Sequence, residues 1–359
     1  MRVVLFVCCF FIFAPYNYCK SQNGGEVIVQ EFLARSIQNN KGGEDAVRSI
    51  SIYLPPDYNK NQDKYPTIYF LPGFTTDDTE LFQWLELKKL MDKAIETKQI
   101  RPVILVVPNS RTKFGGSFYT NSPLIGNWSD FIAKDVVQYV DINYRTLPSR
   151  EYRGLSGHSM GGNGALKLAM LYPDVFSSVY AMSPAVLDWS NEFSTENPGF
   201  KRLSEYKKED DVIDGIATSE GEGNFDAFYA AVFVSMARAY ATSENVSNYK
   251  EISPVYFENN KPKVNDSIKK IWENNFPINM IDNHLSALKS FKGIKIDWGR
   301  NEDFDHVPTT ALAFSKKLEK NGIIHFSEEY LGDHLNKLGG FDGRIYTDML
   351  PFFELFFQD

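Results

Sequence analysis

Short, continuous runs of apolar residues recur along this chain, and segments with helical spacing separate them. The runs 67–71 and 103–107 are rich in β-branched residues, and residues 81–95 between them have helical spacing. Continuous apolar runs are typical of strands buried on both faces of a parallel sheet. Because a strand, a helix and a strand in succession form the βαβ unit, this pattern predicts an α/β fold.

The same alternation continues through most of the chain. Further strands are predicted at 27–33, 49–54, 152–155, 178–182, 294–298 and 324–330, and further helices at 129–144, 163–171, 308–321 and 348–357. The first two strands have an alternating apolar pattern, which favours antiparallel pairing. We therefore expect a mostly parallel central sheet flanked by helices.

The pattern changes between residues 188 and 292. Charged, glycine-rich and asparagine-rich pieces alternate there with helix-like segments at 226–241 and 265–274, and the stretch offers no convincing buried strand. We expect a largely helical insertion on the carboxyl side of the sheet. Two roles stay open for its aromatic residues: a lid or one wall of the acyl pocket, or the core of the insertion itself. Since an α/β fold often uses 250 or so residues as one unit, residues 22–359 are expected to form a single catalytic domain that carries this insertion.

The N-terminus has the pattern of an export signal. Arg2 precedes an apolar run at 3–14, which is too short for a membrane span of around 20 residues. We expect a signal peptide at 1–21 and a secreted or periplasmic protein with no stable membrane insertion. Cys19 offers an alternative, a lipid anchor, although residues 16–18 lack the small side chains expected before a lipidated cysteine. Removal of the signal leaves at most one cysteine, so no intramolecular disulfide is expected.

Composition and charge narrow the function classes. The chain is 43% hydrophobic and 23% charged, with a net charge of −8, and its pI is about 5.3. It has no cluster of Lys and Arg of the kind that neutralises phosphates, which excludes a nucleic-acid partner. Paired Cys and Cys/His spacings and the H-E-x-x-H motif are also missing, so we expect no metal site and no cofactor.

The strongest chemical motif is Gly157-His158-Ser159-Met160-Gly161. A predicted strand precedes it and a helix rich in small residues follows, so the chain must turn sharply at Ser159. Such a turn strains the serine backbone and exposes its hydroxyl above the sheet. The flanking glycines fit because a β-carbon at either position would meet the tight bend. The motif therefore predicts a nucleophilic serine at 159.

A serine nucleophile needs a base, and the base needs an acid to orient it. In folds with this type of turn the chain order is serine, acid, histidine. The sequence has five histidines, of which only His334 lies in a loop directly after the last predicted strand. We expect His334 to be the base. His158 adjoins the nucleophile and is expected to pack beneath the site.

The acid should follow the preceding strand, 294–298. The loop 299–305 offers Glu302, Asp303 and Asp305, and position alone does not choose among them. Glu holds an imidazole as well as Asp does.

Two backbone amides must stabilise the oxyanion that acyl transfer creates. One should be that of Met160, directly after the nucleophile. The other should follow the strand 67–71, where Pro72-Gly73-Phe74 lets the backbone turn inward, and Phe74 is the expected donor.

At these residues the chain resembles the branch of the α/β-hydrolases that contains esterase D, feruloyl esterases and mycolyltransferases, including carbohydrate esterase family one. The matching pieces span nearly the whole mature chain: Leu71 to Phe74, Gly116 to Tyr119, Tyr144-Arg145, Gly157 to Gly162, Pro173 to Phe176, Met182-Ser183-Pro184, Gly299 to Phe304 and Gly332-Asp333-His334. The resemblance implies that the acid stands three residues after the glycine ending its strand, which is Glu302. Many members carry Asp at that position, so Asp303 is the second choice. The family often has His-Gly where this chain has Pro72-Gly73.

Together these patterns predict a secreted serine esterase that works through an acyl-enzyme on Ser159. The resemblance implies a small-molecule or polysaccharide-linked ester, such as an acetyl or feruloyl decoration. Two alternatives remain open. One is an acyltransferase that uses the same three residues with a sugar or another alcohol as acceptor, and the other is a catalytically silent carbohydrate-binding protein on the same fold. The sequence does not determine the oligomeric state.

Overall fold

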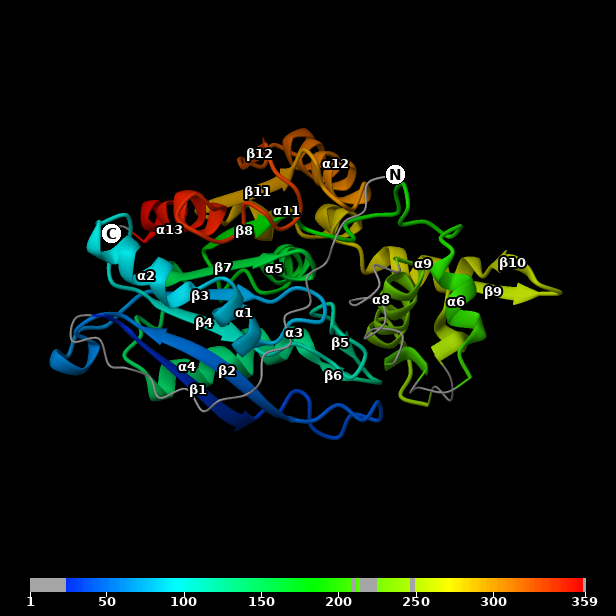
Figure 1. Ribbon diagram of the computed structural model, residues 1–359, viewed down its shortest axis with the longest axis horizontal. Helices are drawn as coiled ribbons and strands as arrows, with labels where there is room; N and C mark the ends of the chain where they lie inside the picture. The colour runs from blue at the N-terminus through cyan, green and yellow to red at the C-terminus, as the bar shows by residue number, and fades with distance from the viewer. Residues whose placement is uncertain (1–23, 208–210, 214–224, 246–248, 358–359) are drawn as a thin grey trace.

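The computed structural model describes residues 24–207, 211–213, 225–245 and 249–357. Within them, eight strands form one twisted sheet (Figure 1). The spatial order is β1 (Glu26–Leu33), β2 (Val47–Leu54), β4 (Ile104–Pro108), β3 (Thr67–Leu71), β7 (Arg153–His158), β8 (Ser178–Met182), β11 (Gly293–Gly299) and β12 (Phe326–Tyr330). The predicted signal peptide at 1–21 lies outside the described residues.

The sheet is mostly parallel, as predicted. All neighbours from β4 to β12 run parallel, whereas β2 pairs antiparallel with both β1 and β4. The residues of β3, β4, β7 and β8 are buried throughout, which explains the continuous apolar runs of β3 and β4. Because β3, β7, β8, β11 and β12 are parallel, the loops that follow them meet at one edge of the sheet.

Helices cover both faces of the sheet. One face packs against α1 (Asp78–Trp84), α2 (Leu87–Glu96), the π-helical turn η6 (Ile345–Met349) and α13 (Leu350–Phe356). The other packs against α3 (Trp128–Asp130), the π-helical turn η2 (Phe131–Val136), α4 (Val137–Asn143), α5 (Met160–Leu171), α11 (Leu285–Lys289) and α12 (His306–Lys320). Successive strand side chains alternate between these two cores. No helix in the described part of the chain has the length and apolar character needed to span a membrane.

One predicted helix was wrong. Residues 81–95 were expected to form a single helix, but α1 ends at Trp84 and α2 begins at Leu87. The chain breaks at Glu86, whose φ of 47° is left-handed, so Leu81 and Leu90 both reach the same core from two helices. The helix predicted at 129–144 is instead α3, η2 and α4 in succession, because one wide turn interrupts its hydrogen-bond pattern.

In its described residues, the region between β8 and β11 has more helix than strand and adds no strand to the central sheet, which confirms the predicted insertion as a feature of the fold. Its described helices and strands are α6 (Gly199–Glu205), α8 (Phe225–Ala239), β9 (Val255–Glu258), β10 (Lys261–Val264), α9 (Asp266–Asn274), α10 (Pro277–Met280) and α11, which packs on the sheet. In Figure 1, α6, α8, α9 and the hairpin of β9 and β10 gather at one end of the molecule.

The remaining described elements are short. They are the strand pair β5 (Asn121–Ser122) and β6 (Gly126–Asn127) and the 3₁₀ turns η1 (Tyr58–Lys60), η3 (Arg150–Tyr152), η4 (Tyr249–Ile252) and η5 (Ile281–Asn283).

Candidate active site

Ser159 stands at the sharp turn between β7 and α5. Its φ of 58° and ψ of −118° lie outside the regions that an L-residue prefers, which is the strain expected at such a turn. Its amide donates to the Met182 carbonyl at 3.0 Å and fixes the turn to β8. A β-carbon on Gly161 would lie 1.9 Å from the Leu71 oxygen, and one on Gly157 would lie 2.4 Å from the Gly161 oxygen. Both glycines are therefore required by backbone packing.

His334 and Glu302 meet at the same edge of the sheet. His334 lies in the loop after β12 and Glu302 in the loop after β11, and His334 Nδ1 is 2.5 Å from Glu302 Oε2. Both are buried, with 5% and 9% of their surface exposed. Since a carboxylate only accepts, Nδ1 carries the proton and Nε2 is left as the basic nitrogen.

Glu302 is held by further donors. Its Oε1 accepts from Ser183 Oγ at 2.6 Å and from the Gly299 amide at 3.0 Å. Burial raises the pKa of this carboxyl, but the hydrogen bonds from His334, Ser183 and Gly299 outweigh burial and hold the pKa of Glu302 below its ordinary value. Asp303 is exposed and forms no hydrogen bond of this kind with a described residue. Of the two acid candidates, the structure therefore brings Glu302, and not Asp303, to His334.

His158 connects the serine turn to the histidine loop. Its Nε2 lies 2.8 Å from the His334 backbone oxygen, and the two rings have centroids 4.5 Å apart. Ser159 itself is partly exposed, and its hydroxyl forms no hydrogen bond with any residue that the structure describes. In ligand-free active sites the hydrogen bond between nucleophile and base is often long and shortens only when substrate binds.

The predicted oxyanion donors lie on either side of the serine turn. We call residues 72–75 the oxyanion loop. A β-carbon on Gly73 would lie 3.7 Å from Ser159 Cβ, so this loop runs directly past the nucleophile. A β-carbon on Gly116 would lie 2.3 Å from Met160 Sδ and 2.8 Å from Phe74 Cδ2, so the side chains of the two predicted donors converge on Gly116. Across the described residues, the backbone amides of Phe74 and Met160 have no protein acceptor.

Aromatic rings join the insertion to the site. Phe228 of α8 lies 5.7 Å from Phe74 and 5.6 Å from Phe304, and Phe304 lies 5.0 Å from His334, all measured between ring centroids. We call Phe74, Phe228 and Phe304 the aromatic wall. It runs from the oxyanion loop across the insertion to the base, so part of the insertion borders the site.

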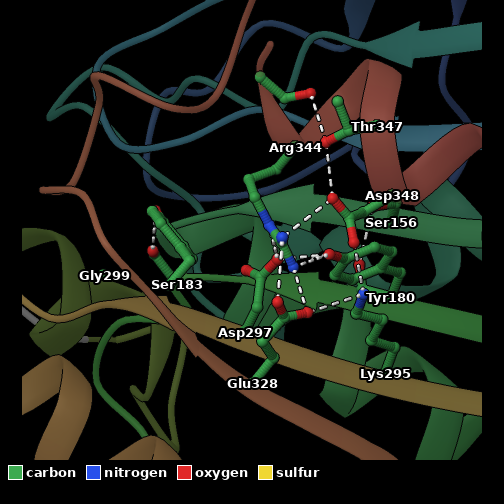
Figure 2. A network of polar contacts seen from close by, with 12 residues as sticks. Ser156, Tyr180, Ser183, Lys295, Asp297, Gly299, Glu328, Arg344, Thr347 and Asp348 are labelled. Carbon is green, nitrogen blue, oxygen red and sulfur yellow. Dashed lines mark hydrogen bonds and ion pairs between the residues drawn. The ribbon is translucent and has the colours of Figure 1, made fainter.

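An ionic network centred on the buried Asp297 and Arg344 joins β8, β11 and β12 (Figure 2). Arg344 Nε donates to Asp297 Oδ2 at 2.9 Å, and its Nη2 donates to Tyr180 Oη at 3.1 Å and to Glu328 at 2.8 Å. Tyr180 also donates to Asp297. The Arg344 guanidinium stacks on Tyr330 at 5.2 Å, and Tyr330 Oη donates to the Asp333 carbonyl at 3.1 Å. The network thereby supports the loop that carries His334.

Sequence reasoning did not assign a role to Ser183, Tyr330 or the His158 contact. Ser183 has a left-handed φ of 39°, and its amide donates to the Asp297 carbonyl at 2.8 Å, which aims its hydroxyl at Glu302. The motif Met182-Ser183-Pro184 was the available signal for Ser183, because a polar residue directly after a buried strand stands at the functional edge of a parallel sheet. Nothing in the local sequence distinguishes Tyr330.

The other histidines lie in different surroundings. His306 Nδ1 lies 2.7 Å from Glu192 Oε1, His325 Nε2 lies 2.7 Å from Ser315 Oγ, and His284 Nδ1 contacts the Met280 carbonyl. Within the described ranges, no three His, Cys, Asp or Glu side chains are grouped so as to hold a metal ion.

Comparison with known proteins finds relatives of this chain both in sequence and in fold. A family model described as "Putative esterase" matches residues 45–337. An esterase of Mycobacterium tuberculosis is 32% identical over 158 residues, which cover 40% of this chain and 32% of that protein. An S-formylglutathione hydrolase of Arabidopsis thaliana is 29% identical over 154 residues, covering 38% of this chain and 51% of the plant enzyme. The matched stretches thus span about a third and about half of these relatives.

Among solved structures, a ferulic acid esterase has a similar fold. The TM-score is 0.63 at 17% identity, and the match covers 93% of this chain and 99% of that one. The chain therefore has the α/β-hydrolase fold.

Proposed function

The chain belongs to this esterase family, and from that premise we propose that it is a carboxylic-ester hydrolase that acts through an acyl-enzyme on Ser159. The observation that carries the proposal is the buried hydrogen bond of 2.5 Å between His334 and Glu302, in a loop tied by His158 to the strained Ser159. A nucleophile at a strained turn, a base and an orienting acid are the parts that acyl transfer requires.

In the proposed reaction, Ser159 Oγ attacks the ester carbonyl while its proton moves to His334 Nε2. Glu302 stabilises the imidazolium that forms, which suits a carboxyl whose pKa is held low. The amides of Phe74 and Met160 donate to the oxyanion. Collapse of this intermediate breaks the bond to the alcohol, which takes the proton from Nε2. A water molecule then attacks the acyl-enzyme by the same steps and releases the acid and free Ser159.

We assign the substrate to the class of small-molecule or polysaccharide-linked esters, with acetyl and feruloyl groups as the first acyl groups to test. The aromatic wall beside His334 supports a flat aryl acyl group, because offset and edge-to-face contacts stabilise aromatic pairs. The names of the similar proteins, an esterase, an S-formylglutathione hydrolase and a ferulic acid esterase, agree with ester cleavage.

We assign residues 22–359 to one catalytic domain with the insertion at 188–292, and residues 1–21 to export. Arg2 and the apolar run at 3–14 support the export signal. N-terminal sequencing of protein recovered from the periplasm or medium of a bacterial host tests this, and an intact Met1 on the exported protein would contradict cleavage.

Covalent labelling with a fluorophosphonate tests the catalytic proposal. The folded wild-type chain should label and hydrolyse short acyl or hydroxycinnamoyl esters, and Ser159→Ala should lose both properties. Ser290→Ala is a matched control, since Ser290 is exposed on α11's end and its hydroxyl contacts only the Ala287 carbonyl among described residues. An unlabelled wild type that is folded by circular dichroism would overturn the proposal in favour of a silent binding protein.

A further inference from the structure

Residues 115–120, which we call the bracing segment, adopt an unusual backbone beside the proposed oxyanion hole. Phe118 and Tyr119 both have a φ of 48°, a left-handed conformation that is unfavourable for residues with a β-carbon. Two successive residues of this kind persist only where surrounding contacts hold them, and such strain is concentrated at functional sites.

The bracing segment contacts the oxyanion loop directly. Tyr119 Oη donates to the Pro72 carbonyl at 2.8 Å, and the Thr75 amide donates to the Gly115 carbonyl at 2.9 Å. These two bonds enclose Gly73 and Phe74 from both ends. Tyr119 is fully buried and its pKa is raised by burial, so its hydroxyl stays protonated and remains a donor.

The Tyr119 ring is itself seated on the helix that begins at the nucleophile. A β-carbon on Gly164 of α5 would lie 2.2 Å from Tyr119 Cδ2, so only glycine admits the ring there. The Tyr119 backbone is fixed as well, because its carbonyl accepts from Ser129 Oγ at 2.6 Å. Contacts to the ring and to the backbone of Tyr119 therefore together fix the position of its hydroxyl.

A buried lysine holds the left-handed turn. Lys167, also on α5 and 2% exposed, donates from Nζ to the Phe118 carbonyl at 3.1 Å and to Thr120 Oγ1. Its Nζ lies 5.2 Å from the centre of the Tyr240 ring, and no carboxylate of a described residue lies within 4.0 Å of it. Burial lowers the pKa of Lys167 to about 7. A desolvated lysine without a carboxylate is costly, which indicates that its bonds to the turn matter.

We infer that Tyr119 is a positioning residue of the oxyanion hole, which orients the Phe74 amide through the Pro72 carbonyl, and that Lys167 keeps Tyr119 in place. This inference rests on the proposed function. Tyr119 does not touch the substrate. It fixes the direction of the peptide units that lead to the Phe74 donor, so that the donor faces the charge that develops at the carbonyl oxygen.

The kinetic consequence is specific. A misdirected oxyanion donor weakens the transition state more than the bound substrate, so kcat falls while KM changes little. Small misplacements of catalytic groups cost up to about 100-fold in rate, and we expect Tyr119→Phe to lower kcat by roughly 10- to 100-fold. Inhibition by an aryl boronic acid, whose adduct with Ser159 mimics the tetrahedral intermediate, should weaken by a similar factor.

Tyr240→Phe is the matched control. Tyr240 is also a buried tyrosine beside the bracing segment, at 6.3 Å from Phe118, but its hydroxyl has no partner among the described residues. This variant should keep kcat and KM within about twofold of the wild type. Both variants keep the aromatic ring and lose one hydroxyl. In Tyr119→Phe this hydroxyl is the donor to the Pro72 carbonyl, whereas in Tyr240→Phe it has no described partner.

Three results decide the inference once the wild type is shown to hydrolyse esters. A fall in kcat at constant KM for Tyr119→Phe alone supports it, whereas equal kinetics of the two variants, or a change confined to KM, overturns it. If Tyr119→Phe does not fold, Thr120→Val carries the test. It removes one of the two acceptors of Lys167 Nζ, together with the hydroxyl that donates to the Phe118 carbonyl, without touching Pro72. It should lower kcat in the same way, and an unchanged kcat overturns the inference. A wild type without esterase activity would instead refute the proposed function.

Discussion

His158 Nε2 lies 2.8 Å from the backbone oxygen of His334, so the residue before the proposed nucleophile holds the loop that carries the proposed base. A carbonyl oxygen only accepts, which fixes the proton of His158 on Nε2. The contact joins residues 176 positions apart in sequence. Burial keeps His158 neutral inside the protein even though this hydrogen bond favours the charged ring, and this has a measurable effect on stability.

Acid should destabilise the protein partly through His158. Burial, together with the nearby His334, lowers the pKa of His158 from 6.5 to about 3. Between these two values the unfolded chain binds a proton that the folded chain does not, so the free energy of unfolding falls as the pH drops through this window. We expect His158→Gln to lose less free energy of unfolding than the wild type between about pH 7 and about pH 4, measured by urea denaturation.

His284→Gln is the control for this measurement, since the His284 ring is partly exposed and far from the serine turn in sequence. It should follow the wild-type pH dependence. An equal acid sensitivity of His158→Gln and the wild type would show that His158 does not contribute.

Glu302, and not Asp303, should be required for activity. Glu302→Gln removes the charge that stabilises the His334 imidazolium and presents an amide to Nδ1, so kcat should fall by roughly 10³- to 10⁴-fold. Asp303 is exposed, and Asp303→Asn should change kcat by no more than about threefold. Steady-state kinetics of the two variants, which differ from the wild type by one charge each, decide between them. If Asp303→Asn lowers kcat more than Glu302→Gln does, Asp303 and not Glu302 is the acid that orients His334.

Phe228 should affect which acyl group is preferred. It bridges Phe74 and Phe304 in the aromatic wall, and an aromatic pair contributes about 0.5–1.5 kcal/mol beyond the area it buries. Phe228→Leu should therefore lower kcat/KM for a hydroxycinnamoyl ester relative to an acetyl ester by about 3- to 10-fold. Phe341→Leu, at an exposed ring outside the aromatic wall, should leave this ratio unchanged. If both variants have the same ratio of kcat/KM values for the two esters, the insertion does not contribute to substrate selection through Phe228.

Arg344 should stabilise the fold by compensating a buried charge. Asp297 is fully buried, and burial raises its pKa even though Arg344 opposes the rise (Figure 2). Arg344→Met leaves this carboxylate without its cation, which should cost about 3–5 kcal/mol of unfolding free energy. The double variant Asp297→Asn with Arg344→Met should cost less than the sum of the single changes. Additive losses in urea denaturation would show that the two residues act independently.

Local sequence patterns were sufficient to predict most of the strands and helices and the position of the proposed nucleophile. The strands at 67–71 and 178–182 were predicted to the residue, because strands buried on both faces are continuously apolar. The same local logic failed at 81–95, where the apolar spacing of two short helices resembles that of one. The left-handed φ at Glu86 that separates them has no sequence signature as clear as a glycine.

The sequence by itself determined that a strained serine stands between a buried strand and a helix, since the glycines and the apolar run that require this turn are all within a few residues of Ser159. Only the tertiary structure decided which carboxylate meets His334, that Ser183 and His158 hold the acid and the histidine loop, and that Tyr119 reaches Pro72. These contacts join loops from different strands. Their geometry depends on how the parallel strands are aligned in the sheet, and no local pattern of residues encodes that alignment.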